Sequence, residues 1–413
     1  MLDNRGLQDI IDARTAALLT LGAGDDVVHN AVAVVENPQR GLRAAAAAGL
    51  LRADSEKPMG VDSQFHIASV VKPMTAVLIF QAVEAGLLGS DGIDTRMIDT
   101  GVLPPEICRR IHCIDGRSYG EAITLRHLLT HTSGLRDGQV DDGDYTADSY
   151  GASAPNSLSA RRAADIKLHL AAREAGQAPP ETLLTRKLWR PWDPARPDDP
   201  YAGLINYYLS GHTAAAHALF RPGEGFHYSD TAFTILAMLA AQLFGRSFDR
   251  LLRERIFDPL GMQDSYFEAW GELDPAPWMR DLSDCWLGKI PLVSAGISLS
   301  NDWGGGGVIA TAGDLNRFLI GLVGGRLFAR DEALRQMLHW SQPPGLAERF
   351  VAVGQGIFIF KSPTGLEVIG HSGVWGAKML CTPENGFFFA GTVNRRGAKG
   401  EWMIEIAEAV AAA

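Results

Sequence analysis

The sequence predicts an α/β protein of the α+β type, with an antiparallel sheet of about five or more strands flanked by helices. Three observations lead to this prediction. Two strand-like segments stand near the start of the chain, and further strand-like segments stand near its end. Helical patterns open and close the chain, and helices dominate its middle. We therefore expect a sheet assembled from both termini, with a mostly helical lobe inserted between its two parts.

These patterns also predict the domain boundaries. The sheet domain is expected to comprise residues 1–88 and 290–413, and the helical lobe residues 89–289. Within the lobe, a long lid-like insertion is expected at about residues 136–221, where the sequence is loop-like.

The composition excludes several classes of protein. The 413 residues are 46% hydrophobic and 21% charged, as in ordinary globular proteins, and the net charge of −10 gives no reason to expect binding to nucleic acid or to an anionic membrane. No apolar run is long enough to predict a transmembrane helix. Residues 1–5 show no signal-peptide pattern, so we expect a cytoplasmic protein, or a periplasmic or secreted one if the sequence is trimmed. The cysteines do not form a C-x-x-C motif and are expected to be free thiols: Cys108, Cys113, Cys285 and Cys381.

The first elements are two strands between two helices. Residues 7–19 carry apolar side chains at helical spacing and predict an amphipathic helix. Residues 31–35 and 42–50 predict strands joined by the turn-rich segment 37–41. Residues 70–88 are apolar nearly all round, which is typical of a buried central helix.

Ser69 and Lys72 stand at the head of this central helix. Their spacing of three places both side chains on one helix face. The N-terminus of a helix favours developing negative charge, which suits a nucleophile whose reaction creates an oxyanion. The alternative interpretation is a capping serine followed by a lysine whose stem is buried.

The segment after the central helix is irregular up to residue 123, and a short helix is then expected within residues 125–135. His127 and His131 are four residues apart, but no third ligand is evident, so we expect no metal site. The acidic residues within 141–148 are interpreted as a solvated loop.

The long insertion contains aromatic residues that are candidates for a substrate pocket: Trp189, Trp192, Tyr207 and Tyr208. We hypothesise that they line a pocket for the acyl or leaving group of a substrate, since aromatic side chains supply apolar area at low entropic cost. The alternative is an insertion that only packs on the surface.

The remaining elements are helices followed by sheet. Helices are predicted at residues 232–244 and 248–256, and a helix capped by Thr311 is predicted to run to residue 322. The glycine run at 303–307 lacks the lysine of a phosphate-binding loop and is interpreted as a tight turn. Four strand-like segments and a closing helix follow, at 352–360, 366–370, 377–382, 387–393 and 402–411.

Two further motifs stand downstream of Ser69 and Lys72. Residues 221–230 are RPGEGFHYSD, and residues 370–374 are GHSGV. In their order and flanking sequence, the three motifs resemble those of the serine β-lactamase and penicillin-binding-protein superfamily. The resemblance is greatest to class C β-lactamases and to the related esterases and D-amino-acid-specific peptidases. It covers most of residues 27–397 and implies a fold of the β-lactamase/transpeptidase type.

The resemblance implies a role for each motif. Ser69 is the acylated nucleophile, Lys72 its proton partner, and Tyr228 a general base and acid. The backbone N–H groups of Ser69 and Val374 form an oxyanion hole, and His371 stands where the family has a basic residue beside the pocket. Whether Lys72 or Tyr228 is the base stays open. Without the resemblance, Tyr228 is a core residue, Asp230 a helix cap and His371 a strand histidine.

Two departures from the family pattern bear on the substrate. The second motif ends in Asp230 where class C β-lactamases have asparagine, and the third begins with His371 where they have lysine. Both departures favour an ester or a small amide over a β-lactam. A carboxylate of Asp230 close to Lys72 would hold it as the ammonium and make Tyr228 the better base.

We therefore expect a serine hydrolase that acts through a covalent acyl-enzyme on a small ester, without metal or other cofactor. The alternatives within catalysis are a D-amino-acid peptidase or amidase, a weak β-lactamase and an acyltransferase. A rival from another class is a non-catalytic binding or sensor protein, which has no need of Ser69, Lys72 and Tyr228 together. The expected partner is a small-molecule ester or amide, and the sequence leaves the oligomeric state open.

Overall fold

The centre of the molecule is a seven-stranded antiparallel sheet with the strand order β10-β11-β12-β13-β14-β1-β2. The computed structural model describes residues 2–20, 22, 24, 27–141, 157–178, 180, 190–196, 199, 202–209, 218–269, 271–299, 303–397 and 401–413. The sheet strands are β1 Asn30–Asn37, β2 Leu42–Gly49, β10 Phe350–Val353, β11 Phe358–Lys361, β12 Glu367–Ser372, β13 Lys378–Thr382 and β14 Phe387–Thr392. The predicted antiparallel sheet, built from both ends of the chain, is confirmed.

Strand β1 shows why this sequence forms a sheet that is buried on both faces. It lies between β2 and β14, with Val32 opposite both Ala47 and Thr392. Alternate side chains of a strand point to opposite faces. Val32 and Val34 pack into one hydrophobic core. The alternate residues Ala31, Ala33 and Val35 pack into another. A strand that is covered on both faces carries a continuous apolar run, as β1 does from residue 31 to residue 35.

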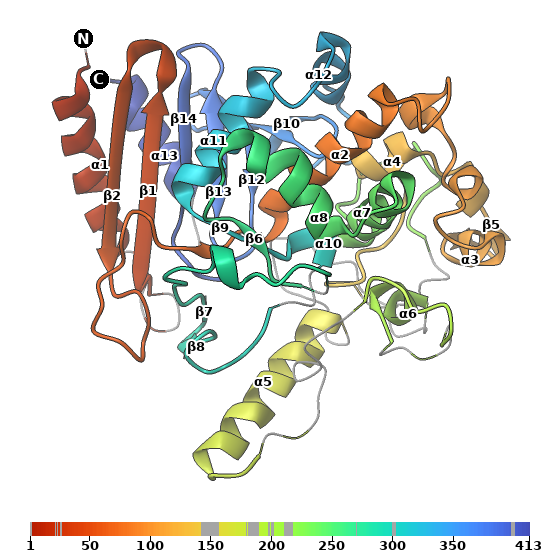
Figure 1. Ribbon diagram of the computed structural model, residues 1–413, viewed down its shortest axis with the longest axis horizontal. Coiled ribbons are helices and arrows are strands. Elements are labelled where there is room, and N and C mark those ends of the chain that lie inside the picture. Colours follow the sequence, from red (N-terminus) through yellow and green to blue (C-terminus); the bar gives the residue numbers. More distant parts are fainter. Residues whose placement is uncertain are drawn as a thin grey trace.

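Helices cover both faces of the sheet, which gives three layers (Figure 1). On one face lie the first and last helices, α1 Asn4–Leu18 and α13 Trp402–Ala411, which pack together in the second core. On the other face lie α11 Ala312–Val323 and the central helix α2 Lys72–Glu84. Asn316 of α11 donates to the carbonyl of Val34, 3.2 Å away, and so ties this helix to β1.

Short helices and small sheets make up the remainder. A three-stranded sheet joins β3 Phe65–His66, β9 Val308–Ala310 and β6 Tyr266–Phe267. The hairpins are β4 Cys113–Ile114 with β5 Arg117–Ser118, and β7 Trp286–Leu287 with β8 Ile290–Pro291. The other helices are α3 Pro105–Arg110, α4 Leu125–Leu129, α5 Leu158–Glu174, α6 Leu204–Leu209, α7 Asp230–Phe244, α8 Phe248–Leu252, α9 Asp258–Leu260, α10 Trp303–Gly306 and α12 Asp331–Met337. All four cysteines are free. Among the described residues, no single helix has the length and apolar character to cross a bilayer; α7 and the segment Phe248–Leu260 meet that test only as a pair bent by 81°.

Three predicted elements differ in detail from the structure. The segment 352–360 is two strands, because the chain turns at Gly356, whose φ is +72°. The central helix begins with a 3₁₀ turn, η3 Ala68–Val71, and ends at Glu84, shortly before Gly86 at φ +74°. After α8, the predicted helix continues as the π-helical turn Arg253–Phe257.

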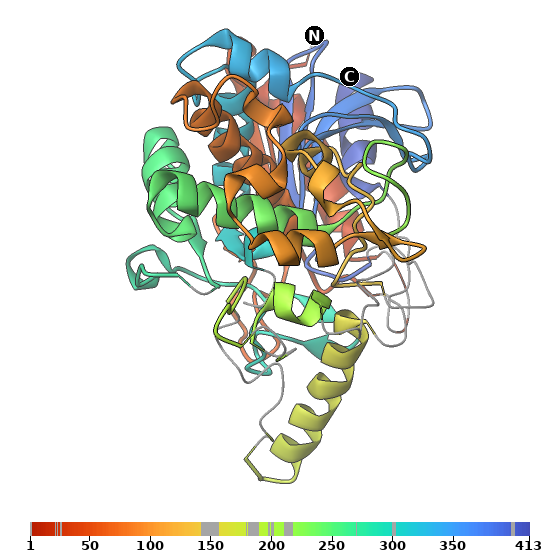
Figure 2. The ribbon, with the colours of Figure 1, turned by 90° about the vertical axis from the view of Figure 1, so that its right-hand side faces the viewer.

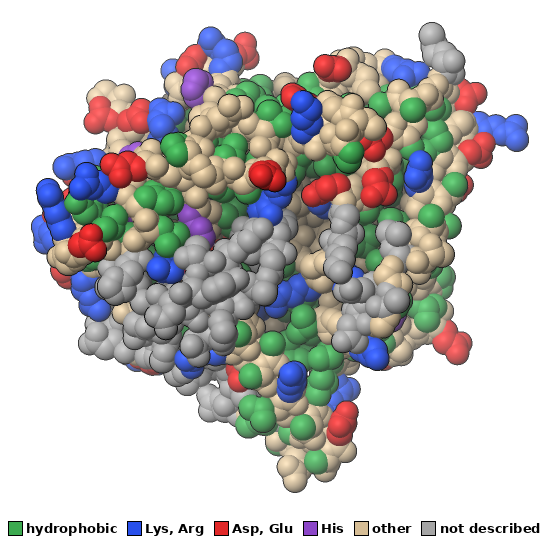
Figure 3. All heavy atoms as spheres, turned by 180° about the vertical axis from the view of Figure 1, so that it is seen from behind, with side chains coloured by type: hydrophobic (Ala, Val, Ile, Leu, Met, Phe, Trp, Pro, Cys, Tyr) green, Lys and Arg blue, Asp and Glu red, His purple; other side chains and the backbone are tan. Residues whose placement is uncertain are grey.

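The sequence did not predict helix α5, which lies within the insertion expected to be loop-like. It begins at the capping residue Ser157 and projects from the body of the molecule (Figures 1 and 2). Seen from behind, the projecting part carries hydrophobic and charged side chains together (Figure 3). Large parts of the insertion lie outside the described residues. The division into domains at residues 88 and 290 stays a prediction.

Candidate active site

Ser69 is held at the start of the central helix by a short ladder of strands. β3 pairs with β9, and the N–H of Ile67 donates to the carbonyl of Val308, 3.1 Å away. Ala68 then takes a positive φ of 47°, a conformation that costs energy for a residue other than glycine. Ser69 is the second residue of η3, whose first N–H groups lack an acceptor within the helix. It lines a pocket, so its hydroxyl is accessible to a small molecule.

Lys72 is fully buried, and its ammonium group has three polar partners. Nζ donates to Ser69 Oγ at 2.9 Å and to the carbonyl of Gly305 at 2.8 Å, and it forms an ion pair with the carboxylate of Asp230. The two hydrogen bonds fix the position of the side chain, and the carboxylate supplies the counter-charge that a buried cation needs. Nζ also lies 5.0 Å from the centre of the Tyr228 ring, within the range of a cation–π contact.

The glycine run that supplies one of these acceptors is a short helix, α10, and not the tight turn that we predicted. A Cβ on Gly304 would lie 2.4 Å from the Cβ of Ala237 on α7, and one on Gly307 would lie 2.9 Å from the Cβ of Ala269. Only glycine lets the backbone approach this closely. The close approach places the carbonyl of Gly305 against Lys72, a contact that sequence reasoning missed, although four consecutive glycines were a signal of close packing.

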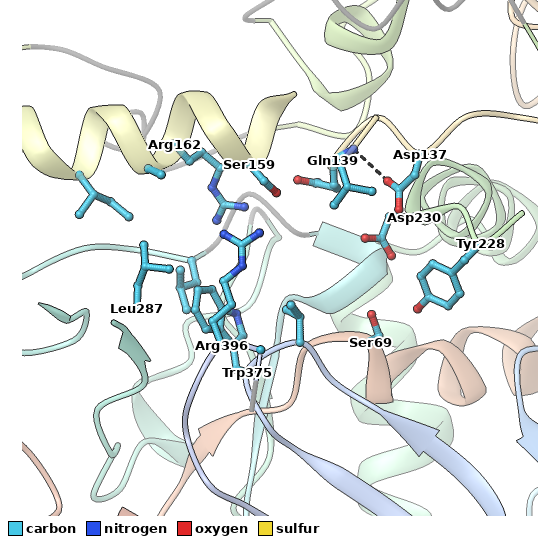
Figure 4. A pocket seen from close by; sticks show the side chains of 16 residues that line it. Ser69, Asp137, Gln139, Ser159, Arg162, Tyr228, Asp230, Leu287, Trp375 and Arg396 are labelled. Atoms are coloured by element: carbon cyan, nitrogen blue, oxygen red, sulfur yellow. Dashed lines mark hydrogen bonds between the residues drawn. The ribbon is translucent and has the colours of Figure 1, made fainter. Parts of the chain in front are cut away.

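Tyr228 precedes α7 and is surrounded by aromatic rings. His131 stacks on it with ring centres 4.3 Å apart, and Phe358 lies behind at 6.4 Å. The N–H of Ser229 donates to Nδ1 of His131 at 3.1 Å, which fixes this ring. Burial and the Lys72 ammonium hold the pKa of His131 well below its usual range, so the ring is neutral. In Figure 4 the hydroxyl of Tyr228 points toward Ser69.

Val374 lines the pocket from a turn that follows β12. The turn is closed by hydrogen bonds from the N–H of Gly373 to the carbonyl of Ala377 and from the N–H of Gly376 to that of Gly373. A Cβ on Gly373 would lie 2.3 Å from the carbonyl oxygen of Ile67. The turn therefore packs directly against the backbone that precedes Ser69, as the predicted oxyanion hole requires.

Asp230 is the first residue of α7, and Ser229, not Asp230, is the helix cap. A second carboxyl group, that of Asp137, lines the pocket at the same end (Figure 4). Burial and the nearby carboxylates of Asp230 and Asp141 raise the pKa of Asp137 well above its usual range. Asp141, which we expected in a solvated loop, is buried and pairs with His227 at 2.7 Å. Sequence reasoning missed Asp137, for which no motif gave a signal.

The other end of the pocket is formed by the insertion and by the chain after β14. Helix α5 contributes Ser159, Arg162 and Ile166, and Arg396 faces Arg162 from the opposite wall (Figure 4). Leu287 and Trp375 add apolar side chains to the lining near the arginines (Figure 4). Among the residues that the structure describes, the insertion thus reaches the pocket through α5 and through the segment before it, with Asp137, Gln139 and Val140.

Three of the predicted substrate-binding residues lie elsewhere. Tyr207 is buried in the main hydrophobic core, and Trp192 packs against that core; neither lines the pocket. Trp189 lies outside the described residues. His371 is fully buried behind Tyr228 and donates from Nδ1 to the carbonyl of Ser372 at 2.9 Å. Burial and Lys72 lower the pKa of His371 to about 3, so it does not act as a basic residue beside the pocket.

The family model described as Beta-lactamase matches residues 9–412 of this chain. The chain belongs to the beta-lactamase family. Among curated proteins, penicillin-binding protein 4* of Bacillus subtilis is 26% identical over 218 residues, which are 52% of this chain and 33% of that protein. Esterase EstB of Burkholderia gladioli is 38% identical over 89 residues, 22% of this chain and 20% of that protein. These alignments span less than half the length of either relative.

A solved structure from the same fold is that of D-amino acid amidase from Ochrobactrum anthropi SV3 complexed with D-phenylalanine. It is 19% identical to this beta-lactamase family member, with a TM-score of 0.66, and the match covers 98% of this chain and 96% of that one. At this level of identity the likeness shows the fold alone, and it confirms the predicted fold class.

Proposed function

We propose that this protein is a serine hydrolase that acts on a small ester through a covalent acyl-enzyme. The observation that carries the proposal is the hydrogen bond from buried Lys72 Nζ to Ser69 Oγ, 2.9 Å long, at the wall of a pocket. A serine hydroxyl is a weak nucleophile until a neighbouring group takes its proton. Ser69 is paired with the buried Lys72, whose Nζ lies 5.0 Å from the centre of the Tyr228 ring. Lys72 and Tyr228 are therefore the groups next to Ser69 that could take part in this proton transfer.

In the proposed mechanism, Tyr228 is the base. Lys72 donates to Ser69 Oγ and to the carbonyl of Gly305, and the carboxylate of Asp230 lies against it as a counter-charge, so we assign Lys72 the role of the cation that stabilises the base. Ser69 attacks the carbonyl carbon of the ester while its proton passes to the Tyr228 phenolate, which the adjacent ammonium stabilises. The N–H groups of Ser69 and Val374 bind the developing oxyanion. The leaving alcohol takes the proton from Tyr228, and water then hydrolyses the acyl-enzyme by the same steps.

The second candidate is a D-amino-acid amidase or peptidase. The observation that favours it is the pair of acidic residues, Asp137 and Asp230, at the Ser69 end of the pocket. A carboxylate there would bind the ammonium group of an aminoacyl substrate. Comparing p-nitrophenyl esters with D-aminoacyl amides and nitrocefin distinguishes the ester, amide and β-lactam alternatives, and added alcohol acceptors reveal acyl transfer.

The nucleophile is tested by covalent labelling. Wild-type protein treated with a fluorophosphonate should gain one adduct in intact-mass spectrometry, and Ser69→Ala should gain none and lose at least about a thousandfold in esterase rate. Ser159→Ala is the matched control, since Ser159 lines the same pocket from α5. It should still be labelled. Equal labelling of wild type and Ser69→Ala would mean that the nucleophile is elsewhere.

A further inference from the structure

The pocket has two chemically different ends. Ser69, Tyr228 and Asp230 lie at one end, and the guanidinium groups of Arg162 and Arg396 lie at the other, where they point toward each other from opposite walls (Figure 4). Both arginines are partly exposed. A ligand that enters this pocket therefore meets the nucleophile at one end and two cationic groups at the other.

The backbones that carry the two arginines are anchored. Arg162 lies in the first turns of α5, where Ser157 caps the helix and the N–H of Ser159 donates to the carbonyl of Gln139 at 2.9 Å. The N–H of Arg396 donates to the carbonyl of Trp286 at 3.0 Å, and that of the next residue, Gly397, donates to Val374 at 3.2 Å. The second arginine is thus tied to the turn that we propose for the oxyanion hole. Anchored backbones lower the entropy lost when the side chains bind a ligand.

Apolar side chains also line the pocket. They come from α5, from β7, from the segment after β8 and from the turn after β12: Ile166, Leu287, Leu299, Val374 and Trp375. A substrate that spans the pocket would place an apolar segment against these side chains.

We propose that Arg162 and Arg396 form a carboxylate-binding subsite, and that the substrate is an ester or amide with a carboxylate group separated from its scissile carbonyl by an apolar segment. The inference rests on the proposed function and names its substrate class. A guanidinium carries five N–H donors in a planar fork that matches a carboxylate in bidentate geometry, so each arginine can serve such a ligand in addition to other partners. The resemblance implied a basic residue beside the pocket at His371. Since His371 is buried and neutral, the positive charge that the pocket offers a ligand comes from Arg162 and Arg396.

The charges at the Ser69 end are consistent with such a substrate. Asp230 is paired with Lys72, and burial and the nearby carboxylates of Asp230 and Asp141 raise the pKa of Asp137 well above its usual range. Both effects lower the negative charge that an anionic substrate meets when its carbonyl group approaches Ser69.

Matched substrates test the subsite. The first pair is mono-p-nitrophenyl adipate and p-nitrophenyl hexanoate, whose acyl groups differ in the terminal carboxylate. The second pair is 4-carboxyphenyl acetate and phenyl acetate, which place the carboxylate on the leaving group. The measured quantity is the ratio of kcat/KM for the acidic ester to kcat/KM for the neutral one. We expect Arg162→Gln/Arg396→Gln to lower this ratio by at least about tenfold for one pair, and added salt to lower it in the wild type.

Two variants serve as controls. Arg173→Gln changes an arginine at the far end of the same helix, where it donates to the carbonyl of Ser294 at 3.2 Å, and it should leave the ratio unchanged. Arg162→Lys keeps the charge and should retain part of the preference. A ratio that is equal in wild type and double variant for both pairs would overturn the proposal.

The subsite can be tested independently of hydrolysis. Calorimetric binding of adipate to Ser69→Ala, lost when both arginines are also replaced by glutamine, supports the subsite even if no ester is turned over. In that case the proposed function fails and the subsite stands. Conversely, hydrolysis of neutral and acidic esters with no effect of the arginines leaves the proposed function intact and overturns the subsite.

Discussion

At the scale of single residues, the decisive feature is the set of three partners around Lys72. Ser69 and Gly305 accept hydrogen bonds from this buried side chain and Asp230 forms an ion pair with it, and the three come from three separate parts of the chain. The sequence predicted two of these contacts, because Ser69 and Lys72 belong to one motif and Asp230 to another. It did not predict the contact to Gly305, because a backbone carbonyl carries no residue type that a pattern could single out.

Asp230→Asn should move the acidic limb of the kcat/KM profile to lower pH. The substitution removes a negative charge that disfavours the Tyr228 phenolate, and it leaves the charge of Lys72 less neutralised, so the base ionises more readily. The measurement is kcat/KM for p-nitrophenyl acetate as a function of pH. Asp193→Asn is the control, since Asp193 pairs with Arg196 at 2.9 Å and does not line the pocket. An acidic limb that stays or moves upward would contradict the role of Asp230.

At the scale of elements, the contact between the turn after β12 and the backbone before Ser69 sets the proposed oxyanion hole. Ala68 packs in one apolar cluster with Trp375, and the two backbones approach closely because Gly373 has no Cβ. A glycine within a strand pattern signals close approach of another backbone, but the pattern does not say which one.

Gly373→Ala should lower kcat by at least about tenfold, because the added Cβ would meet the Ile67 carbonyl at 2.3 Å and displace the N–H of Val374. Esterase kinetics and the thermal midpoint are measured together. Gly313→Ala in α11 is the control, because its Cβ would find only ordinary contacts, the nearest at 3.8 Å. That variant should be as stable as the wild type or more stable by up to about 1 kcal/mol, with unchanged kcat. An active Gly373→Ala enzyme would show that this turn does not bind the oxyanion.

The elements that sequence reasoning missed share a physical cause. α5 buries few of its side chains, among them Leu158 and Ile166, so its apolar stripe is weak, and the cap at Ser157 and the many helix-forming residues are its local signals. The strands of the sheet were predicted because their sequences are strand-like and turn residues separate them. Trp192 and Tyr207 were assigned to the pocket for their residue type, but the hydrophobic core attracts aromatic side chains equally well.

At the scale of the whole molecule, two uncharged histidines lie in the interior between the sheet and the helices. Burial holds the pKa of both His131 and His371 below the usual value. In the unfolded chain these groups bind protons once the pH falls below about 6.5, whereas in the folded protein they do not. A group whose folded pKa is lowered contributes stability that is present above its unfolded pKa and lost as the pH falls through the window between the two values.

The free energy of unfolding should therefore fall on acidification. Between about pH 6.5 and pH 5, His371 alone should account for a loss of about 2 kcal/mol, since each unit of pH within the window costs about 1.4 kcal/mol per group. Urea unfolding of the wild type and of His371→Asn at about pH 7 and pH 5 measures this difference. Because the comparison is between pH values within one variant, an overall loss of stability from the substitution does not obscure it. Equal acid sensitivity of both proteins would contradict a neutral His371.

The pairing of β1 with β14 has a consequence for protein synthesis. Val32 leaves the ribosome long before its partner Thr392, and β1 has only β2 beside it until then. Strand pairing over such a sequence separation is slow and leaves apolar edges open in the nascent chain. The turn with Val374 also emerges about three hundred residues after Ser69. In the growing polypeptide, the proposed nucleophile Ser69 is therefore without its proposed oxyanion hole until the turn with Val374 has been synthesised and has folded against it.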